Sequence, residues 1–370
     1  MSARRHAGAG DPADPFRAFL ARAPKAEIHV HLEGAVSGAF LDAAATRHGL
    51  PWAGATQGEL DRRRRFDSFE GFLALYRWVL ENHFRAPEDY VGALLDVAPG
   101  LAAAGIRYAE LSVSAGALLF FRRPLGEILD ALTSAADAVE AAGGPELRFI
   151  ADGVQKHGPD ALARVVERVA PLPRARWPAL GLAGALGSER VGAFAQVFAE
   201  ARRHGLAADI HAGEAAGTES VREALEDLAA DRIVHGVAAA GEPGLLQELR
   251  KRRIPVALNP TSNLRTGVVA SLAEFPLRRF LQAGLLISIN TDDPTLFDTT
   301  LAGELEAMAR TFRLGQSAVE GLILGGLECA LLPERRRAEM LERWGFELER
   351  LRAELGLDDA LRGSPPRVYD

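Results

Sequence analysis

Short apolar runs bounded by turn residues recur along the chain, and each is followed by a stretch long enough to hold a helix. We identify eight of them as strands: 27–32, 107–114, 146–154, 179–184, 207–212, 232–236, 255–259 and 286–291. Strands that alternate with helical segments form β-crossover-β units and therefore a parallel sheet. Eight such units predict an α/β fold, the closed (β/α)8 TIM barrel.

The segments between these strands have the pattern of amphipathic helices, with Ala, Leu and Val at three- and four-residue spacing among charged residues. Six are clear: 86–104, 158–170, 189–204, 218–230, 241–252 and 273–283. Beyond residue 302 the pattern is helical to about Leu361, which predicts a helical C-terminal extension, and Arg62 to Arg65 reads as a solvated helix start. We expect one catalytic barrel domain over residues 15–361, between a flexible leader (1–14) and an irregular tail (362–370).

The connection after the first strand is unusually long, and we expect it to hold a helical insertion. One helical face of it carries six apolar side chains: Phe66, Phe69, Phe72, Leu73, Tyr76 and Leu80. An amphipathic core helix explains this face. The alternative is that part of the insertion roofs a pocket at the end of the first strand, because long connections in compact domains are often lids.

Composition narrows the class of protein and of partner. The chain is 48% hydrophobic and 25% charged, as in ordinary soluble globular proteins. Its formal net charge is −7 with scattered arginines, which argues against nucleic acid and membrane surfaces as partners. The single cysteine, Cys329, excludes an intrachain disulfide and a cysteine-based zinc site, which favours the cytoplasm. A small-molecule substrate is the expected partner, and a homo-oligomer is possible.

Ionisable side chains gather at the predicted strand ends. They are His29 and His31 in the first strand, His211 in the fifth, His235 in the sixth, and Asp292 and Asp293 after the eighth. In a barrel of parallel strands, the carboxyl ends all open on one face, where active sites are built. We therefore expect these six side chains to converge on one mouth.

Four of these residues form a candidate metal site. His29 and His31 are two positions apart, so both imidazoles leave an extended strand on the same face. His211 adds a third nitrogen and Asp292 an oxygen, a ligand set that suits catalytic zinc with a water position open. A divalent cation lowers the pKa of its water from about 15.7 to roughly 7, so hydroxide becomes available as a nucleophile at neutral pH. The run 179–184 has neither lysine nor acid to bridge two metals, which favours one zinc per chain.

The remaining polar residues at the mouth are candidates for proton transfer and substrate binding. Glu214 in the turn HAGE is either a surface-loop residue or a general acid whose pKa burial raises. We expect His235 to orient the nucleophile or move its proton, and Asp293 to hydrogen-bond substrate. His157 could lie inside or outside the pocket. Ordinary surface positions are expected for the other histidines, which are His6, His48, His83 and His204.

Five motifs occur in the order PKAEIHVHLEGA (24–35), HAGE (211–214), RIVHG (232–236), NPTSN (259–263) and INTDDP (289–294). In order and approximate spacing they resemble the metal-dependent adenosine and adenine deaminases of the amidohydrolase superfamily. The resemblance spans residues 20 to 345, and it implies a (β/α)8 barrel that removes the 6-amino group of a purine as ammonia.

Position by position, the resemblance also implies roles for single residues. The implied zinc ligands are His29, His31, His211 and Asp292. The implied catalytic and substrate contacts are Glu214 at purine N1, His235 at the hydroxide, Asp293 at N7 and the backbone N–H of Gly184 at N3, with His31 and Glu33 beside the substrate.

The chain departs from the family pattern at three places. Glu33 stands where adenosine-specific relatives usually carry an aspartate that contacts the sugar. Adenosine-type members usually have acidic residues directly after the LAG run, but this chain has Ala185 and Leu186 there, and Ser188 and Glu189 follow only later. The LDSSE-like run of adenine deaminases is also missing. The stretch AELSVSAG (109–116) lacks the usual Arg and Pro.

These features lead to competing hypotheses. The leading one is hydrolytic deamination of adenosine and 2′-deoxyadenosine, supported by Gly184 in the LAG run. The alternative is free adenine or another adenine derivative, supported by Glu33, which strand alternation directs toward the mouth. A catalytically silent purine- or metal-binding barrel is disfavoured by the complete ligand set with Glu214 and His235. A phosphoester or amide hydrolase is disfavoured by the missing bridging residue.

Overall fold

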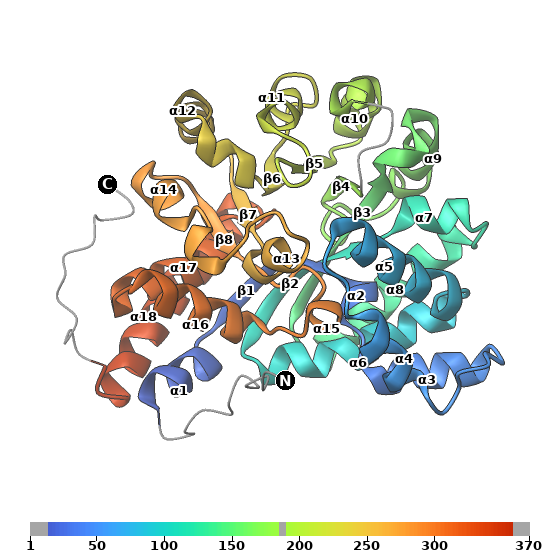
Figure 1. Ribbon diagram of the computed structural model, residues 1–370, viewed down its shortest axis with the longest axis horizontal. Coiled ribbons are helices and arrows are strands. Elements are labelled where there is room, and N and C mark those ends of the chain that lie inside the picture. The colour runs from blue at the N-terminus through green and yellow to red at the C-terminus, as the bar shows by residue number, and fades with distance from the viewer. Residues whose placement is uncertain (1–13, 185–189, 358–370) are drawn as a thin grey trace.

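Eight strands form one parallel sheet in the order β1 to β8 in the computed structural model, which describes residues 14–184 and 190–357. The strands are β1 (Lys25–His31), β2 (Ile106–Val113), β3 (Glu146–Val154), β4 (Ala179–Ala183), β5 (Ala207–Ala212), β6 (Arg232–His235), β7 (Val256–Leu258) and β8 (Ile287–Ile289). A parallel bridge between Val30 and Asp292 joins β1 to the segment after β8 and closes the sheet. The predicted (β/α)8 barrel is confirmed, and Figure 1 shows its helices surrounding the strands.

The helices around the barrel follow the strands in sequence. They are α6 (Pro87–Ala103), α8 (Leu125–Ala141), α9 (Pro159–Val169), α10 (Ala195–Arg203), α11 (Thr218–Glu226), α12 (Pro243–Arg252), α14 (Leu277–Gln282) and α17 (Gln316–Glu328). Seven of them occupy segments that were predicted to be helical, and each of the seven buries an apolar face against the protein. The exception is α8, which was not predicted although its buried Leu125, Ile128, Leu129 and Leu132 recur at helical spacing.

The insertion after β1 is helical, as predicted. It consists of α2 (Leu32–Ala35), α3 (Gly38–Arg47), α4 (Thr56–Arg63) and α5 (Phe69–His83). The prediction that Arg62 to Arg65 start a helix is wrong, because α4 ends at Arg63. Cationic side chains in a last turn are favourable there, since the C-terminal end of a helix carries partial negative charge.

Both ends of the described chain pack beside the barrel. Asp14 accepts a hydrogen bond from the Phe16 N–H and caps α1 (Pro15–Arg22), so it belongs to a helix and not to a leader. The C-terminal extension comprises α16 (Leu301–Phe312) and α18 (Glu334–Glu354), which ends earlier than the predicted Leu361. The rest of the predicted leader and the predicted tail lie outside the described residues. Across 14–184 and 190–357, the apolar stretches of the helices are too short to cross a membrane.

Short elements at the carboxyl ends of the strands shape the mouth of the barrel. They are α7 (Ala115–Phe120) after β2, the 3-10 helix η1 (Gln155–His157) after β3, α13 (Pro260–Arg265) after β7 and α15 (Pro294–Phe297) after β8.

Candidate metal centre and active site

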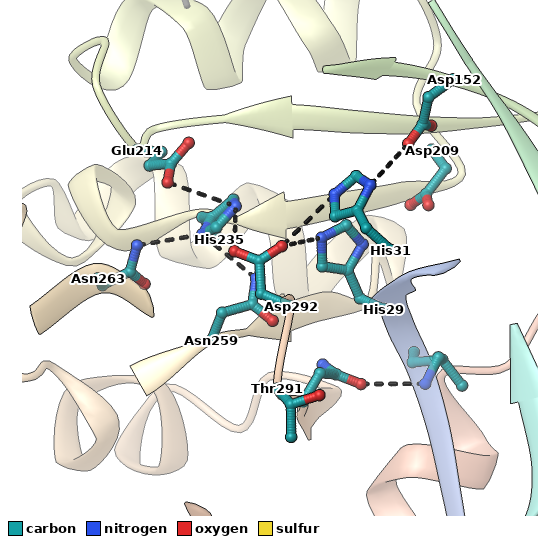
Figure 2. Close-up of polar contacts among 12 residues, drawn as sticks. His29, His31, Asp152, Asp209, Glu214, His235, Asn259, Asn263, Thr291 and Asp292 are labelled. Atoms are coloured by element: carbon teal, nitrogen blue, oxygen red, sulfur yellow. Dashed lines mark hydrogen bonds and ion pairs between the residues drawn. The ribbon is translucent and has the colours of Figure 1, made fainter. Parts of the chain in front are cut away.

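The four predicted metal ligands converge at the carboxyl end of the barrel. The His29 and His31 ring centroids are 5.0 Å apart, and the His211 centroid lies 4.8 Å from that of His29. Asp292 Oδ1 lies 3.1 Å from His29 Nε2 and 3.4 Å from His31 Nε2. Figure 2 shows this carboxylate facing both imidazoles of β1.

The chemistry of this donor set fits a divalent cation with nitrogen and oxygen ligands. Donor atoms of His29, His31 and Asp292 lie within 4.8 Å of one another, and so do those of His29, His211 and His235. Burial and neighbouring histidines lower the pKa of His31 to about 3 and the pKa of His211 well below its usual range. The rings are therefore neutral at neutral pH, which is the form that binds a metal.

Backbone geometry sets the direction of two of these side chains. Asp292 and His235 have φ values of 66° and 65°, in the left-handed region that non-glycine residues seldom adopt. The Asp292 peptide is fixed on both sides, because its N–H donates to the His29 carbonyl and its carbonyl accepts from the His31 N–H. Such strained residues cluster at functional sites, where the surrounding structure holds them in place.

His235 and Glu214 lie together beside the candidate metal centre. His235 Nε2 is 3.6 Å from Glu214 Oε1 and 3.9 Å from Asp292 Oδ2. The side-chain amides of Asn259 and Asn263 donate to His235 Nδ1 at 3.2 and 3.1 Å, which leaves the proton of the neutral ring on Nε2 (Figure 2). Burial, followed by repulsion from Asp292, raises the pKa of Glu214 well above its usual range. This shift favours the protonated form of Glu214, which is the form that a general acid requires.

Asp293 lines a cavity at the carboxyl end of the barrel. Its Oδ1 is buried without a hydrogen-bond partner among the described residues, and burial together with Asp292 raises its pKa. The motif HLEGA contains Gly34 for a steric reason, since a Cβ there would lie 1.8 Å from Asp293 Oδ1. Gly184 lines the same cavity with φ of 96°, but the residues that follow it, 185–189, lie outside the described part of the chain.

Asp152 on β3 is a site residue that the sequence analysis missed. Its Oδ2 lies 3.6 Å from His31 Nδ1, and neither oxygen has a hydrogen-bond partner among the described residues. A Cβ at Gly181 on the neighbouring strand would lie 1.7 Å from Asp152 Oδ1, so that glycine makes room for the carboxylate. Carboxylates beside ligating histidines fix ring orientation. Asp152 lies near the carboxyl end of a predicted strand, so the reasoning that identified the histidines at the strand ends could also have identified it. Asn259 and Asn263, the partners of His235, belong to the motif NPTSN, but no role was predicted for them.

Glu33 does not lie where strand alternation directed it. β1 ends at His31 and Glu33 belongs to α2, so the two-residue repeat no longer applies. The carboxylate is fully buried away from the cavity, where it accepts hydrogen bonds from Tyr76, Tyr90 and the Ser114 N–H. A sugar contact by Glu33 therefore has no support in this geometry.

A cavity of about 420 Å³ opens above these residues. Its outer wall includes Phe69, Phe72, Leu73, Tyr76 and Leu80 of α5, so the expectation that the insertion covers a pocket agrees with the structure. Phe66 is the exception among the six apolar residues, because α5 begins only at Phe69.

The five remaining histidines lie in different parts of the chain. His157 lines the cavity and stacks on Phe120, with ring centroids 4.6 Å apart. The surface expectation is wrong for His83, which is fully buried with Nδ1 3.1 Å from the Val79 carbonyl oxygen. His48 is half-buried against Asp89, His204 is exposed as expected, and His6 lies outside the described residues.

The chain is similar to known proteins over most of its length. The sequence profile of the adenosine deaminase family matches residues 24–344. The chain is 35% identical to the aminodeoxyfutalosine deaminase of Streptomyces coelicolor, covering 90% of this chain and 87% of that protein. It is 32% identical to the adenine deaminase of a Chelativorans species, covering 86% and 97%.

A solved amidohydrolase from Burkholderia ambifaria with bound Zn superposes with a TM-score of 0.85 at 25% identity, covering 96% of this chain and 98% of that one. The names of these relatives favour the alternative hypothesis, adenine or another adenine derivative, over the leading hypothesis of adenosine.

Proposed function

Because the chain belongs to the adenosine deaminase family of metal-dependent hydrolases, we propose that it removes the 6-amino group of an adenine ring as ammonia, using one zinc ion. One observation carries this proposal: three candidate ligands, His31, His211 and Asp292, line one cavity at the carboxyl end of the barrel together with Glu214 and His235. The fourth, His29, lies against them, with its Nε2 3.1 Å from Asp292 Oδ1.

His29, His31, His211 and Asp292 would hold the cation. When bound, it would supply Lewis-acid chemistry and lower the pKa of water, so that a nucleophile forms at neutral pH. Neutral imidazoles and an ionised carboxylate are the required ligand forms. Burial opposes ionisation of Asp292, but the hydrogen bond with His29 and the neighbouring histidines lower its pKa far below its usual range.

The protein's own acids provide the other half of the chemistry. Addition of water at C6 makes the ring nitrogen N1 basic, and a protonated Glu214 can donate to it. Asp293 lines the cavity with an Oδ1 that has no hydrogen-bond partner among the described residues, and its raised pKa favours the protonated form that can donate to N7. His235 accepts from Asn259 and Asn263 at Nδ1, so its Nε2–H would donate a hydrogen bond to the attacking oxygen, orient it and stabilise its negative charge.

The proposed substrate is an adenine compound other than adenosine. The named activities of the relatives support this choice, and the buried position of Glu33 removes a sugar contact that adenosine-specific members are expected to make. A steady-state comparison of adenine, adenosine and aminodeoxyfutalosine, following ammonia release, tests the proposal. We expect adenosine to have the lowest kcat/KM. If the zinc-loaded protein releases ammonia from none of the three compounds, the proposed reaction is refuted.

A further inference from the structure

Two of the sequence motifs contain buried polar residues that take no part in the proposed reaction. They are Glu27 in PKAEIHVHLEGA and Thr291 in INTDDP, and each is only 2% exposed. A buried carboxylate is unfavourable unless hydrogen bonds compensate for the lost water. Glu27 has such partners, because its Oε1 accepts from the Thr291 N–H at 3.0 Å and from the Thr291 hydroxyl at 2.5 Å. One oxygen of Glu27 therefore holds both hydrogen-bond donors of Thr291.

This pair lies where the barrel closes. In the part of the chain that the structure describes, the edge strands β1 and β8 are joined by the isolated Val30–Asp292 bridge instead of a full ladder. Side chains supply further contacts there, since the buried Asn290 Oδ1 accepts from the Ile28 N–H at 3.1 Å. Polar side chains thus connect β1 to the segment that leads from β8 to the metal centre.

Thr291 directly precedes the candidate ligand Asp292 (Figure 2). The left-handed φ of 66° at Asp292 is unfavourable for a residue with a side chain, so it persists only where the surroundings hold it. The His29 carbonyl and the His31 N–H hold the Asp292 peptide, and Glu27 holds the residue before it. In this conformation the Asp292 carboxylate faces both imidazoles of β1.

We propose that Glu27 is a positioning residue of the metal centre. By holding both donors of Thr291, it keeps Asp292 in the conformation that presents its carboxylate to the cation. Glu27 is not among the described residues that line the cavity, so it acts through Thr291 and not on the substrate. The inference rests on the metal centre of the proposed function. Groups that orient metal ligands are typically worth about 10–100-fold in metal affinity.

The first test removes the hydroxyl of Thr291. The dissociation constant for zinc is measured by competition between the zinc-loaded full chain and a chelator of known zinc affinity. Thr291→Val has the shape of threonine without the hydroxyl, and we expect it to raise the zinc Kd by about tenfold. Thr291→Ser keeps the hydroxyl, and its Kd should stay within about threefold of wild type.

The second test changes the acceptor. Glu27→Met removes both carboxylate oxygens and should raise the zinc Kd by about 10–100-fold, whereas Glu27→Gln keeps an oxygen that can accept from Thr291 and should stay near wild type. Thr133→Val is the matched control, because Thr133 Oγ1 accepts from the buried Trp177 Nε1 at 2.8 Å on α8, outside the cavity lining. It also exchanges a hydroxyl for a methyl group, and it should keep the wild-type Kd. Thermal unfolding with zinc in excess verifies that each variant is folded.

The outcomes separate this inference from the proposed function. Wild-type zinc affinity in Thr291→Val and Glu27→Met, even with lowered stability, would overturn the inference and leave the proposed reaction standing. If Glu27→Met does not fold, Thr291→Val decides alone. A Kd for Thr133→Val that rises as far as that of Thr291→Val would also overturn the inference, since loss of stability would then explain both.

The zinc affinities do not depend on turnover. If the wild-type protein binds zinc but deaminates no adenine compound, the proposed reaction fails, and the same comparison of variants still decides the role of Glu27. If the wild-type protein binds no zinc, the proposed metal centre fails and the inference fails with it.

Discussion

Replacing Glu214 by glutamine tests the assignment of the general acid. The two side chains have the same shape, and glutamine can donate a hydrogen bond but cannot transfer a proton. The Glu214 side chain is only 11% exposed, and its raised pKa favours the neutral form, so a neutral glutamine of the same shape should leave the fold intact. Positioned general acids typically contribute about 10²–10⁴ in rate.

We therefore expect kcat for Glu214→Gln to fall by about 10²–10⁴, which is about 3–5 kcal/mol of transition-state stabilisation. The KM should change far less, because the glutamine N–H still donates to the purine. Ammonia release gives the rate, and elemental analysis gives the zinc content, which should be unchanged. Glu219→Gln is the matched control, since that glutamate lies on α11 with its side chain 68% exposed. Turnover of Glu214→Gln within a few fold of wild type would refute the assignment.

Three further changes test the metal site, the room around it and a buried histidine. His211→Ala should lose bound zinc while His204→Ala, an exposed position, should retain it, as measured by elemental analysis after dialysis. Gly181→Ala should lower the free energy of unfolding by about 1–3 kcal/mol through overpacking, whereas Gly126→Ala, where a Cβ meets open space, should not destabilise the protein in urea titrations. Burial lowers the folded pKa of His83 to about 4, below the unfolded value of 6.5, so its contribution to stability is complete above pH 6.5 and is lost as the pH falls toward 4. Urea unfolding at about pH 7 and 5 should show a smaller loss for His83→Gln than for wild type, and equal losses would contradict the prediction.

The barrel and the placement of its polar residues could be predicted from the sequence because both depend on short periodicities. Apolar runs of strand length identified every strand, and the shared direction of parallel strands predicted that His29, His211 and Asp292 would meet. The two-residue repeat correctly put His29 and His31 on the same face of β1.

The same repeat failed at Glu33, because nothing in its immediate sequence marks the end of β1 at His31. The partners that bury Glu33, Tyr90 and Ser114, are 57 and 81 residues away along the chain. The buried His83 likewise has a distant neighbour, Trp52, which lies 31 residues away along the chain. Local sequence patterns do not show such contacts. The burial of Glu33 and His83 could therefore be seen only in the tertiary structure.

The central claim is that water replaces the 6-amino group of an adenine ring in the cavity above His29, His31, His211 and Asp292. The most direct measurement is mass spectrometry of the product formed by zinc-loaded protein in water enriched in oxygen-18, with ammonia measured in parallel. We predict one labelled oxygen at C6 of the purine for each ammonia released, and no product after removal of the metal by a chelator. An unlabelled product, or a turnover rate that survives removal of the metal, would contradict the account.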